Sequence, residues 1–354
     1  MKEYTLPIAF LLAPFAILST GYIWTGQQIG LMIIFLVLMA NLIDNRWLRA
    51  FLFYAIAWQT VLFVQAMIHP GMFQSAIASG YTQALFMTAG AMIYLTASRS
   101  KVALPVFYNV ICIAALIQTV IALLQRFGGV DIVPLVLSLI APARSSLGSG
   151  ALVGFLGNPN YLAAFLAFSV PFFFRKWWIW SLPLVAVALV VSMSSAAVIP
   201  AIIGAGVFLG FRLGKKWWFL IDTTAILLVA GYFVFDGNHL SVSERFQGWA
   251  AAINQVVQWP LGIAFGLGPG ATWANNYPLH SEWVTLFHQF GVIGLILAAG
   301  YLLTVSRKNI YLFSSFVIIV INMFGNATLH IAPTAFLACM VAGLMERERS
   351  QGNV

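Results

Sequence analysis

Three residues of this chain carry the side chains best suited to chemistry: His280, Arg144 and Arg245. An imidazole can transfer protons near neutral pH, and Glu282 and His288 are near enough to His280 in the sequence to orient it or tune it. A single histidine near the end of a helix is ordinarily a polar anchor. The nearby acid and the two arginines nevertheless favour His280 as a catalytic base.

Arg245 directly follows Ser241-Val242-Ser243-Glu244, a capping-box pattern that predicts the start of a helix running to about Gln258. Its apolar residues recur at helical spacing, so we expect this helix to lie along a membrane surface. Arg245 would stand in the first turn, where free N–H groups and the helix dipole favour an anion. A guanidinium there suits a phosphate, which it can grip through two parallel hydrogen bonds. The alternative is a salt bridge to Glu244 or Asp236.

Two further segments could contribute amide groups to a site. Residues 260–270 are rich in glycine, which lets a backbone approach a ligand or turn sharply, but they lack the Gly-Lys-Ser/Thr of a Walker loop. Asn158 and Asn160 stand in Gly157-Asn158-Pro159-Asn160-Tyr161, where they could cap a helix or bind sugar hydroxyls. We therefore treat Gly268, Asn158 and Asn160 as candidate supporting or sugar-binding residues.

The sequence offers no sign of a metal or a cofactor. It has no His-Glu-x-x-His or paired-histidine spacing for zinc. The acids Asp131, Asp236, Glu244 and Glu282 are scattered, without an Asp-x-Asp pair for a divalent cation. The two cysteines lie far apart inside apolar runs and are expected to be packing residues. The prediction is a metal-independent site without a cofactor.

The elements that must position these residues follow from the composition. The chain has 354 residues, of which 62% are hydrophobic and only 7% charged, whereas soluble domains carry about 25% charge. A water-soluble fold is therefore excluded. Runs such as Leu31–Met39 and Leu184–Val191 are apolar on every face, unlike the alternating strands of a membrane barrel. Helices are the remaining spanning structure, so we predict an all-α integral membrane protein with a single polytopic domain over residues 1–354.

Apolar stretches bounded by charges, glycine or proline predict about twelve transmembrane helices. Their approximate limits are 6–24, 28–43, 48–68, 78–97, 103–124, 160–174, 177–192, 195–211, 217–235, 282–304, 309–325 and 329–345. With both termini in the cytoplasm, all of the 17 basic residues except Arg126, Arg144 and Arg245 fall on the cytoplasmic side, as the positive-inside rule requires. This asymmetry explains the net charge of +8 without any nucleic acid partner.

Two extracytoplasmic loops are much longer than the others, at about 125–159 and 236–281. They contain Arg144, Arg245 and His280. Positively charged residues are normally found on the cytoplasmic side of a membrane, so two arginines in extracytoplasmic loops are unexpected. Only these loops combine polar groups, access to water and room for a substrate. We therefore predict that they form the active site.

Together these segments resemble the O-antigen ligase and polymerase superfamily of bacterial membrane glycosyltransferases. The resemblance covers about 140–300, nearly half the chain. It rests on Arg144 followed by Gly154–Ala163, on Arg245–Trp249, on Gly266–Gly270, and on His280–Trp283 running into Gly291–Leu295. The chain departs from the family at Ser194-Ser195-Ala196, where the family often has Ser-Arg, so no role of that arginine carries over.

The resemblance implies a glycan donor on undecaprenyl pyrophosphate and transfer to an acceptor hydroxyl at the periplasmic face of the bacterial inner membrane. The arginines that match Arg144 and Arg245 would hold the pyrophosphate, and the histidine that matches His280 would activate the acceptor. A pyrophosphate leaving group does need positive charge, and a hydroxyl nucleophile needs a base. Attack from the face opposite the pyrophosphate would invert the anomeric centre.

The number of spans and the His280 motif favour the ligase branch, in which the acceptor is the lipid A core of lipopolysaccharide. A polymerase would use another lipid-linked repeat unit, and a protein O-glycosyltransferase a serine or threonine. A lipid-linked glycan transporter or flippase is the alternative from another class. Transporters usually carry ionisable groups at mid-membrane and related halves, and here His288 is almost the only such residue within a span.

Overall fold

The computed structural model describes residues 26–68, 87–128, 159–192, 194–214, 239–268, 281–325 and 332–351. Every regular element in these ranges is a helix, which confirms the all-α prediction. The elements are α2 (Gly26–Asn41), α3 (Arg46–Ile68), a helix at residues 87–98, α5 (Leu104–Phe127), α7 (Pro159–Phe173), the 3-10 turn η5 (Ile179–Ser181), α8 (Leu182–Val191), α9 (Ser195–Leu213), α11 (His239–Val257), α12 (Gly262–Phe265), α14 (Glu282–Leu303), α15 (Ile310–Gly325) and α16 (Ala332–Gln351).

The predicted spans that fall on described residues all coincide with helices. The short turn expected at Ser192–Ser195 is also present, because α8 ends at Val191 and α9 begins at Ser195. The predicted spans 6–24 and 217–235 lie outside the described residues. Apolar runs bounded by charges or glycine thus locate these helices well, because such runs can satisfy their backbone only internally.

Helix length does not confirm the number of membrane crossings. Of the described helices, only Leu104–Phe127 and Glu282–Leu303 are both long and apolar enough to cross a membrane. The shorter apolar helices are Asn160–Phe173, Ile179–Val191, Ala197–Leu213 and Ile310–Gly325. At 1.5 Å per residue, the ten residues of α8 reach about half of a 30 Å hydrocarbon layer. Twelve crossings therefore remain part of our proposal below.

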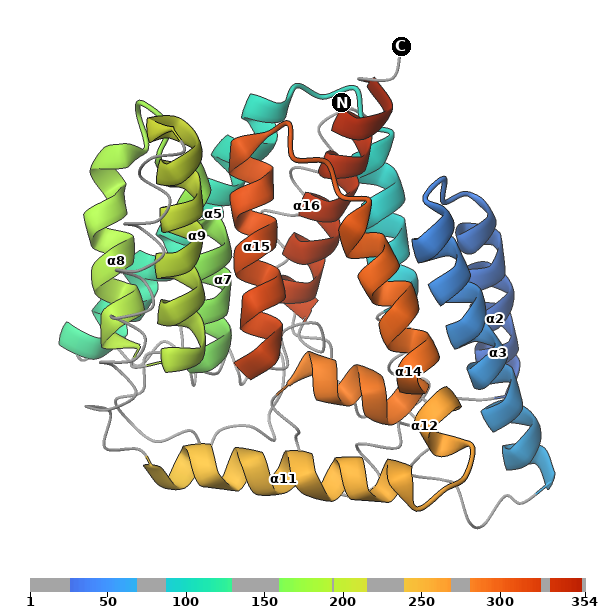
Figure 1. Ribbon diagram of the computed structural model, residues 1–354. Coiled ribbons are helices and arrows are strands. Elements are labelled where there is room, and N and C mark those ends of the chain that lie inside the picture. The colour runs from blue at the N-terminus through green and yellow to red at the C-terminus, as the bar shows by residue number, and fades with distance from the viewer. Residues whose placement is uncertain are drawn as a thin grey trace.

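Most of the helices stand side by side in a bundle (Figure 1). Helix α7 packs against α5, α8, α9, α15 and α16, while α3 packs against both α2 and α14. Phe165, Phe168, Phe172 and Phe173 of α7 are completely buried. A helix that is apolar on every side needs such a surround of neighbours.

The connections that follow α2, the 87–98 helix, α7 and α14 all lie at one end of the bundle, at the top of Figure 1. Basic residues at this end hold helix ends together. Arg99 Nη2 donates to Leu42 O at 2.7 Å, and Arg347 Nη1 donates to Ser100 O and Val102 O at 2.9 and 2.7 Å. The clustering of basic residues expected from the sequence is therefore present at this end.

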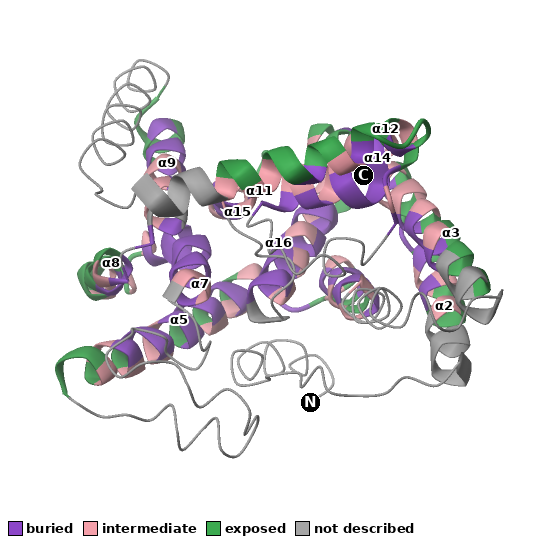
Figure 2. Cartoon of the chain, turned by 90° about the horizontal axis from the view of Figure 1, so that it is seen from below, coloured by how far each residue is buried: buried purple, intermediate pink, exposed green. Residues whose placement is uncertain are grey.

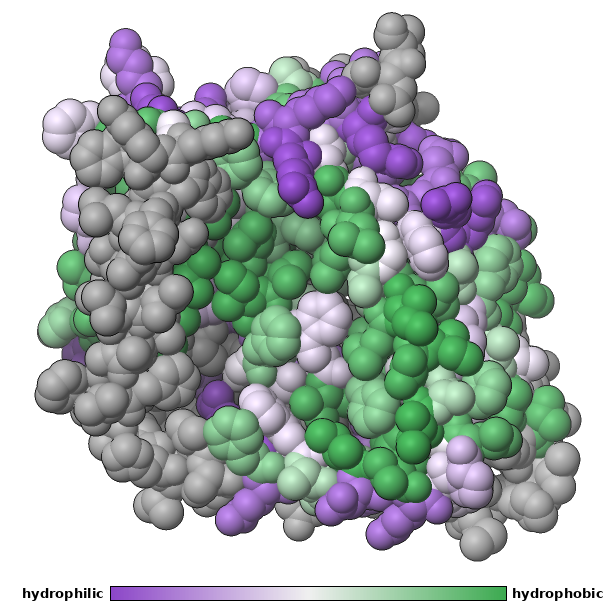
Figure 3. All heavy atoms as spheres, in the orientation of Figure 1, coloured by the Kyte–Doolittle hydropathy of each residue, from purple (hydrophilic) through white to green (hydrophobic). Residues whose placement is uncertain are grey.

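The outer surface of the bundle is rich in large apolar side chains. Figure 3 shows them as a broad hydrophobic band between hydrophilic residues at the two ends. Ile34, Leu38 and Ile296 are more than half exposed. A broad band of exposed apolar side chains indicates contact with lipid or with another protein.

One helix departs from the bundle and positions the candidate site. Helix α11 lies across the end opposite the basic connections (Figure 1). Seen from below, one side of it is exposed and the other faces the bundle (Figure 2). It packs against α12 and against α14. The candidate site is built from these three helices, the end of α15 and two aromatic residues of α3.

Candidate functional site

The inner face of α11 is set by helical spacing. Arg245, Trp249, Ala252 and Val256 recur every three or four residues and are half-buried or buried, so they share the face directed at the bundle. The outer side carries Phe246 and other exposed residues. This amphipathic arrangement confirms the helix that we predicted from the sequence.

Helix α14 is two arms joined at Gly291, whose φ of 62° and ψ of −162° break the helical path. The first arm, residues 282–290, lies across the end of the bundle above α11, and the second arm rises through the bundle (Figure 1). The helix predicted at 282–304 is therefore present, with a bend that the sequence analysis did not anticipate. The sequence allows this bend because glycine alone populates that backbone region readily.

The start of α14 is bound to the last turns of α15. Ser281 caps the helix by accepting from Val284 N–H, and its Oγ donates to Met323 O at 3.4 Å. Trp283 Nε1 donates to Val320 O at 3.3 Å, and its ring lies 5.5 Å from that of Phe324. These contacts bury the residues that directly follow His280 in the sequence.

The glycine-rich segment crosses α14 at its bend. Leu267 N–H donates to His288 O at 2.8 Å and Gly268 N–H donates to Gln289 O at 3.0 Å. A Cβ on Gly266 would overlap the backbone of Gln289, so the glycines allow two backbones to touch. The amide of Gly268, which we expected to support a sugar site, is thus already bound within the protein and holds this crossing.

Two aromatic residues of α3 hold the same crossing. Tyr54 Oη is 2.9 Å from Phe265 O and 3.1 Å from Phe290 O, and Trp58 Nε1 donates to Phe265 O at 3.0 Å. The sequence analysis missed both residues. The two residues are four positions apart on a predicted helix and so lie on one face of it. This spacing could have marked them as a pair, but it does not reveal what they bind.

Arg245 lies on α11 but not where the capping box placed it. The helix begins at His239, so Arg245 is in the second turn, beyond the first four residues whose N–H groups are free. Our argument from the helix dipole is therefore wrong for this residue. Its Nη1 instead donates to Gly325 O at 3.0 Å, at the end of α15.

The environment of Arg245 still favours an anion. Burial lowers the pKa of its guanidinium below the ordinary value, but an arginine remains charged at neutral pH. Within the part of the chain that the structure describes, its hydrogen-bond partner is the Gly325 carbonyl, which is uncharged. An anionic ligand would offset the hydration that this half-buried cation has lost. The two acids that the sequence offered as alternative partners, Asp236 and the side chain of Glu244, lie outside the described residues.

His288 and Glu282 both lie on the first arm of α14 and are buried. His288 Nε2 lies 3.0 Å from Gln255 Oε1 of α11, so this pair joins the two helices. Gln255 is ten residues beyond Arg245, or about 15 Å along the helix, so the structure does not bring His288 to Arg245. The sequence analysis also missed Gln255, although a polar residue beside the inner face of α11 was a usable signal.

The remaining candidates are placed only in part. His280, Arg144 and Asn158 lie outside the described residues. Asn160 is the second residue of α7, which begins at Pro159, so it is inside the first turn and does not precede the helix as a cap does. In the residues that can be described, no three histidine, cysteine or acidic side chains are placed to hold a metal ion.

No protein-family model and no curated protein sequence matches this chain. The site must therefore be interpreted from its own geometry and chemistry.

Proposed function

We propose that this protein is a membrane glycosyltransferase that moves a glycan from undecaprenyl pyrophosphate to an acceptor hydroxyl, as an O-antigen ligase does with the lipid A core. The observation that carries the proposal is the position of Arg245. It is a half-buried cation on a helix that crosses one end of an apolar bundle, and its hydrogen bond to Gly325 places it beside the start of α14. A lipid-linked pyrophosphate needs a cation at that place, between an apolar bundle and water.

The chemistry requires two functions at this end of the protein. The bond to a pyrophosphate leaving group breaks more readily when positive charge faces the oxygens on which charge develops, and Arg245 with Arg144 would supply it. The acceptor hydroxyl needs a base, and His280, which precedes the buried Ser281 in the sequence, would supply that. Attack opposite the pyrophosphate would invert the anomeric centre. The mechanism requires no metal ion.

The distribution of apolar and basic residues supports the proposed location. The hydrophobic band would lie in the bacterial inner membrane, with about twelve crossings that include residues 6–24 and 217–235. The end that carries the basic connections would face the cytoplasm. Helix α11 and the first arm of α14 would then face the periplasm, where the lipid-linked donor and the acceptor glycolipid meet.

The test is reconstitution of the full chain in liposomes with a radiolabelled undecaprenyl-pyrophosphate glycan. Three acceptors are supplied in turn: the lipid A core, a second lipid-linked repeat unit, and a serine- and threonine-containing protein. We expect transfer to the lipid A core. Transfer only to one of the other two would assign a polymerase or a protein glycosyltransferase, and movement of the donor across the bilayer without transfer would contradict the enzyme altogether.

The same assay tests the proposed base. His280→Ala should lower transfer by at least about a hundredfold, a usual effect of losing a general base, while expression and unfolding remain unchanged. His69→Ala serves as the matched histidine control and should transfer at the parent rate. An active His280→Ala protein would remove this residue from catalysis.

A further inference from the structure

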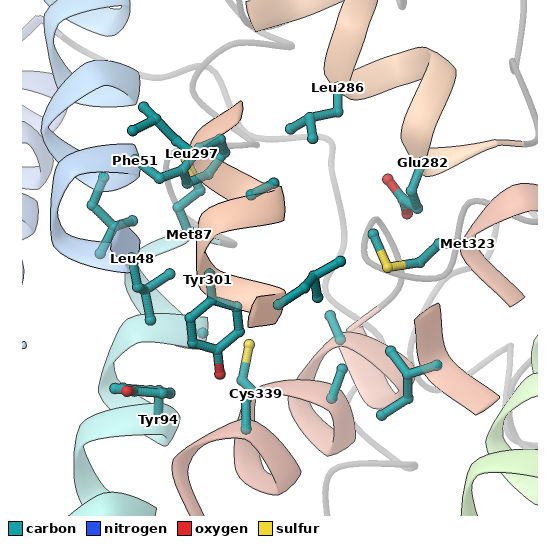
Figure 4. A pocket seen from close by; sticks show the side chains of 18 of the residues that line it. Leu48, Phe51, Met87, Tyr94, Glu282, Leu286, Leu297, Tyr301, Met323 and Cys339 are labelled. Atoms are coloured by element: carbon teal, nitrogen blue, oxygen red, sulfur yellow. The ribbon is translucent and has the colours of Figure 1, made fainter. Parts of the chain in front are cut away.

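A cavity of about 320 Å³ lies between α3, the 87–98 helix, α14, α15 and α16 (Figure 4). Its wall is almost entirely apolar, and among the described residues that line it Glu282 alone is charged. Like charges repel strongly where water is excluded, so this cavity does not suit the phosphate of a membrane lipid. An anionic headgroup fits better where cations are positioned by neutral partners.

Such a cation stands at the basic end of the bundle, where α7 ends and the chain turns toward α8. Arg175 Nη1 donates to Asn109 Oδ1 at 2.8 Å and to Pro105 O at 3.3 Å. The guanidinium carbon lies 5.4 Å from the centre of the Tyr108 ring. Asn109 Oδ1 also accepts from Trp178 Nε1 at 3.0 Å. These contacts hold the guanidinium in place before any ligand arrives, which lowers the entropy lost on binding.

The guanidinium of Arg175 keeps donors for a ligand. An arginine has five N–H donors, and the bonds to Asn109 and Pro105 use those of Nη1. In the described part of the chain, both of these partners are uncharged, and the donors on Nε and Nη2 have no hydrogen-bond partner. The described charged groups that act on the Tyr108 hydroxyl are Arg175, Arg347 and the acid Glu348, so positive charge is in excess at this corner.

Exposed apolar side chains continue from this corner along α8. Trp177 and Trp180 are 81% and 84% exposed, and the ammonium of Lys176 lies 5.9 Å from the centre of the Trp177 ring. Leu184 and Val187 of α8 are exposed as well, and Figure 2 shows exposed residues on the side of α8 that faces away from the bundle. Tryptophan is typical of the boundary between lipid headgroups and lipid chains. The corner therefore combines cations, boundary aromatics and an apolar surface in the order in which a lipid presents their counterparts.

We propose that this corner binds an anionic phospholipid, whose phosphodiester is held by Arg175 and Lys176 and whose chain lies along the exposed side of α8. The oxygens of a phosphodiester match the planar fork of a guanidinium. A zwitterionic lipid carries a cation of its own, which offsets this attraction. The inference requires that the bundle lies in a membrane, but it does not require that the protein transfers a glycan.

Binding can be measured on the full chain, purified in detergent and freed of lipid, by native mass spectrometry with phosphatidylglycerol or phosphatidylcholine. Each basic residue near an anionic headgroup is worth about fivefold in affinity, so two should favour phosphatidylglycerol by roughly thirtyfold. Arg175→Gln should weaken phosphatidylglycerol binding by about fivefold and leave phosphatidylcholine binding unchanged. Arg49→Gln is the matched control, because it removes an exposed arginine of α3 at the same end of the bundle but far from α8 (Figure 1). Equal weakening in both variants would mean a diffuse attraction to positive charge and would overturn the site.

Asn109→Asp tests the geometry while Arg175 stays in place. Asn109 is exposed, so a carboxylate there should be tolerated, and circular dichroism checks that the helices are intact. The new carboxylate would replace the amide oxygen that now lies 2.8 Å from Arg175 Nη1 and would neutralise the guanidinium. Phosphatidylglycerol binding should then fall about as much as in Arg175→Gln. Binding equal to that of the parent would show that Arg175 does not hold the headgroup.

A phosphatidylglycerol with a photoactivatable diazirine in its chain locates the bound lipid. Crosslinks should form within residues 184–190 of the parent and should be lost in Arg175→Gln. Glycerol 3-phosphate, which has the phosphate without the chains, should not displace the lipid at equal concentration. Crosslinks confined to other helices, or displacement by glycerol 3-phosphate, would overturn the lipid assignment. A parent dimer that Arg175→Gln converts to a monomer, with lipid binding unchanged, would assign this corner to a second copy of the chain instead.

Discussion

The addition of one methyl group at Gly291 should strongly destabilise this protein. The φ of 62° and ψ of −162° of this glycine lie in a region that is essentially restricted to glycine, and another residue there costs about 1–3 kcal/mol. A Cβ at this position would also overlap the carbonyl of Ala264 and the nitrogen of Gly266. Both are backbone atoms, so no side-chain rotation can relieve the overlap.

Relief requires the two crossing segments to separate. Separation would break the hydrogen bonds from Leu267 and Gly268 to the first arm of α14, which are 2.8 and 3.0 Å long and contribute about 1 kcal/mol each. We therefore expect Gly291→Ala to lower the free energy of unfolding by about 3–5 kcal/mol.

The assay is unfolding of the purified protein in mixed micelles with increasing dodecyl sulfate, followed by circular dichroism. Gly248→Ala is the matched control, because Gly248 lies inside α11 and a Cβ there meets no atom within 4 Å. In a helix interior this change should stabilise by up to about 1 kcal/mol. A loss below about 1 kcal/mol for Gly291→Ala, or an equal loss in both variants, would refute the reasoning, because the strain alone should exceed it.

Three further predictions concern the site and the crossing that holds it. Arg144→Ala and Arg245→Ala should each slow transfer from the lipid-linked donor, and lysine should rescue only partly because it lacks the planar fork of arginine. Their combined loss should be non-additive, and strictly additive rates would contradict a shared pyrophosphate. Tyr54→Phe removes the hydroxyl that bonds Phe265 O and Phe290 O and should lower stability by about 1–3 kcal/mol in the micelle assay; an unchanged midpoint would show that this hydroxyl does not hold the crossing. Transfer should persist in excess EDTA, and a loss restored by magnesium would reveal a metal site.

The sequence located the helices better than it located their ends. The apolar runs predicted α5 and α9 to within a few residues, because a buried or lipid-facing helix must be apolar over most of its surface. The start of α11 was predicted too late, because Ser241 and Ser243 resemble caps although the helix begins at His239. A cap signal is local, whereas the end of a helix also depends on what packs against it.

The candidate site was predictable in part. The sequence singled out Arg245 as a cation with an unusual position, and the structure places it half-buried against Gly325. It also singled out His288 as a side chain that could tune His280, and the structure pairs it with Gln255 on another helix. Side-chain types show what chemistry is possible, but the partner of each side chain depends on contacts between distant segments.

The sequence by itself determined that this protein is helical. A chain so apolar and so poor in charge must satisfy its backbone internally, and its long runs that are apolar on every face do not fit the alternating strands of a membrane barrel. The bend of α14 was decided by the tertiary structure. Glycine permits the backbone of Gly291 to turn but does not impose the turn. The bend exists because Gly266 packs against it and because Tyr54, more than 200 residues away in the sequence, holds both carbonyls at the crossing. No local pattern contains that contact, because it forms only when three separate segments of the chain have come together.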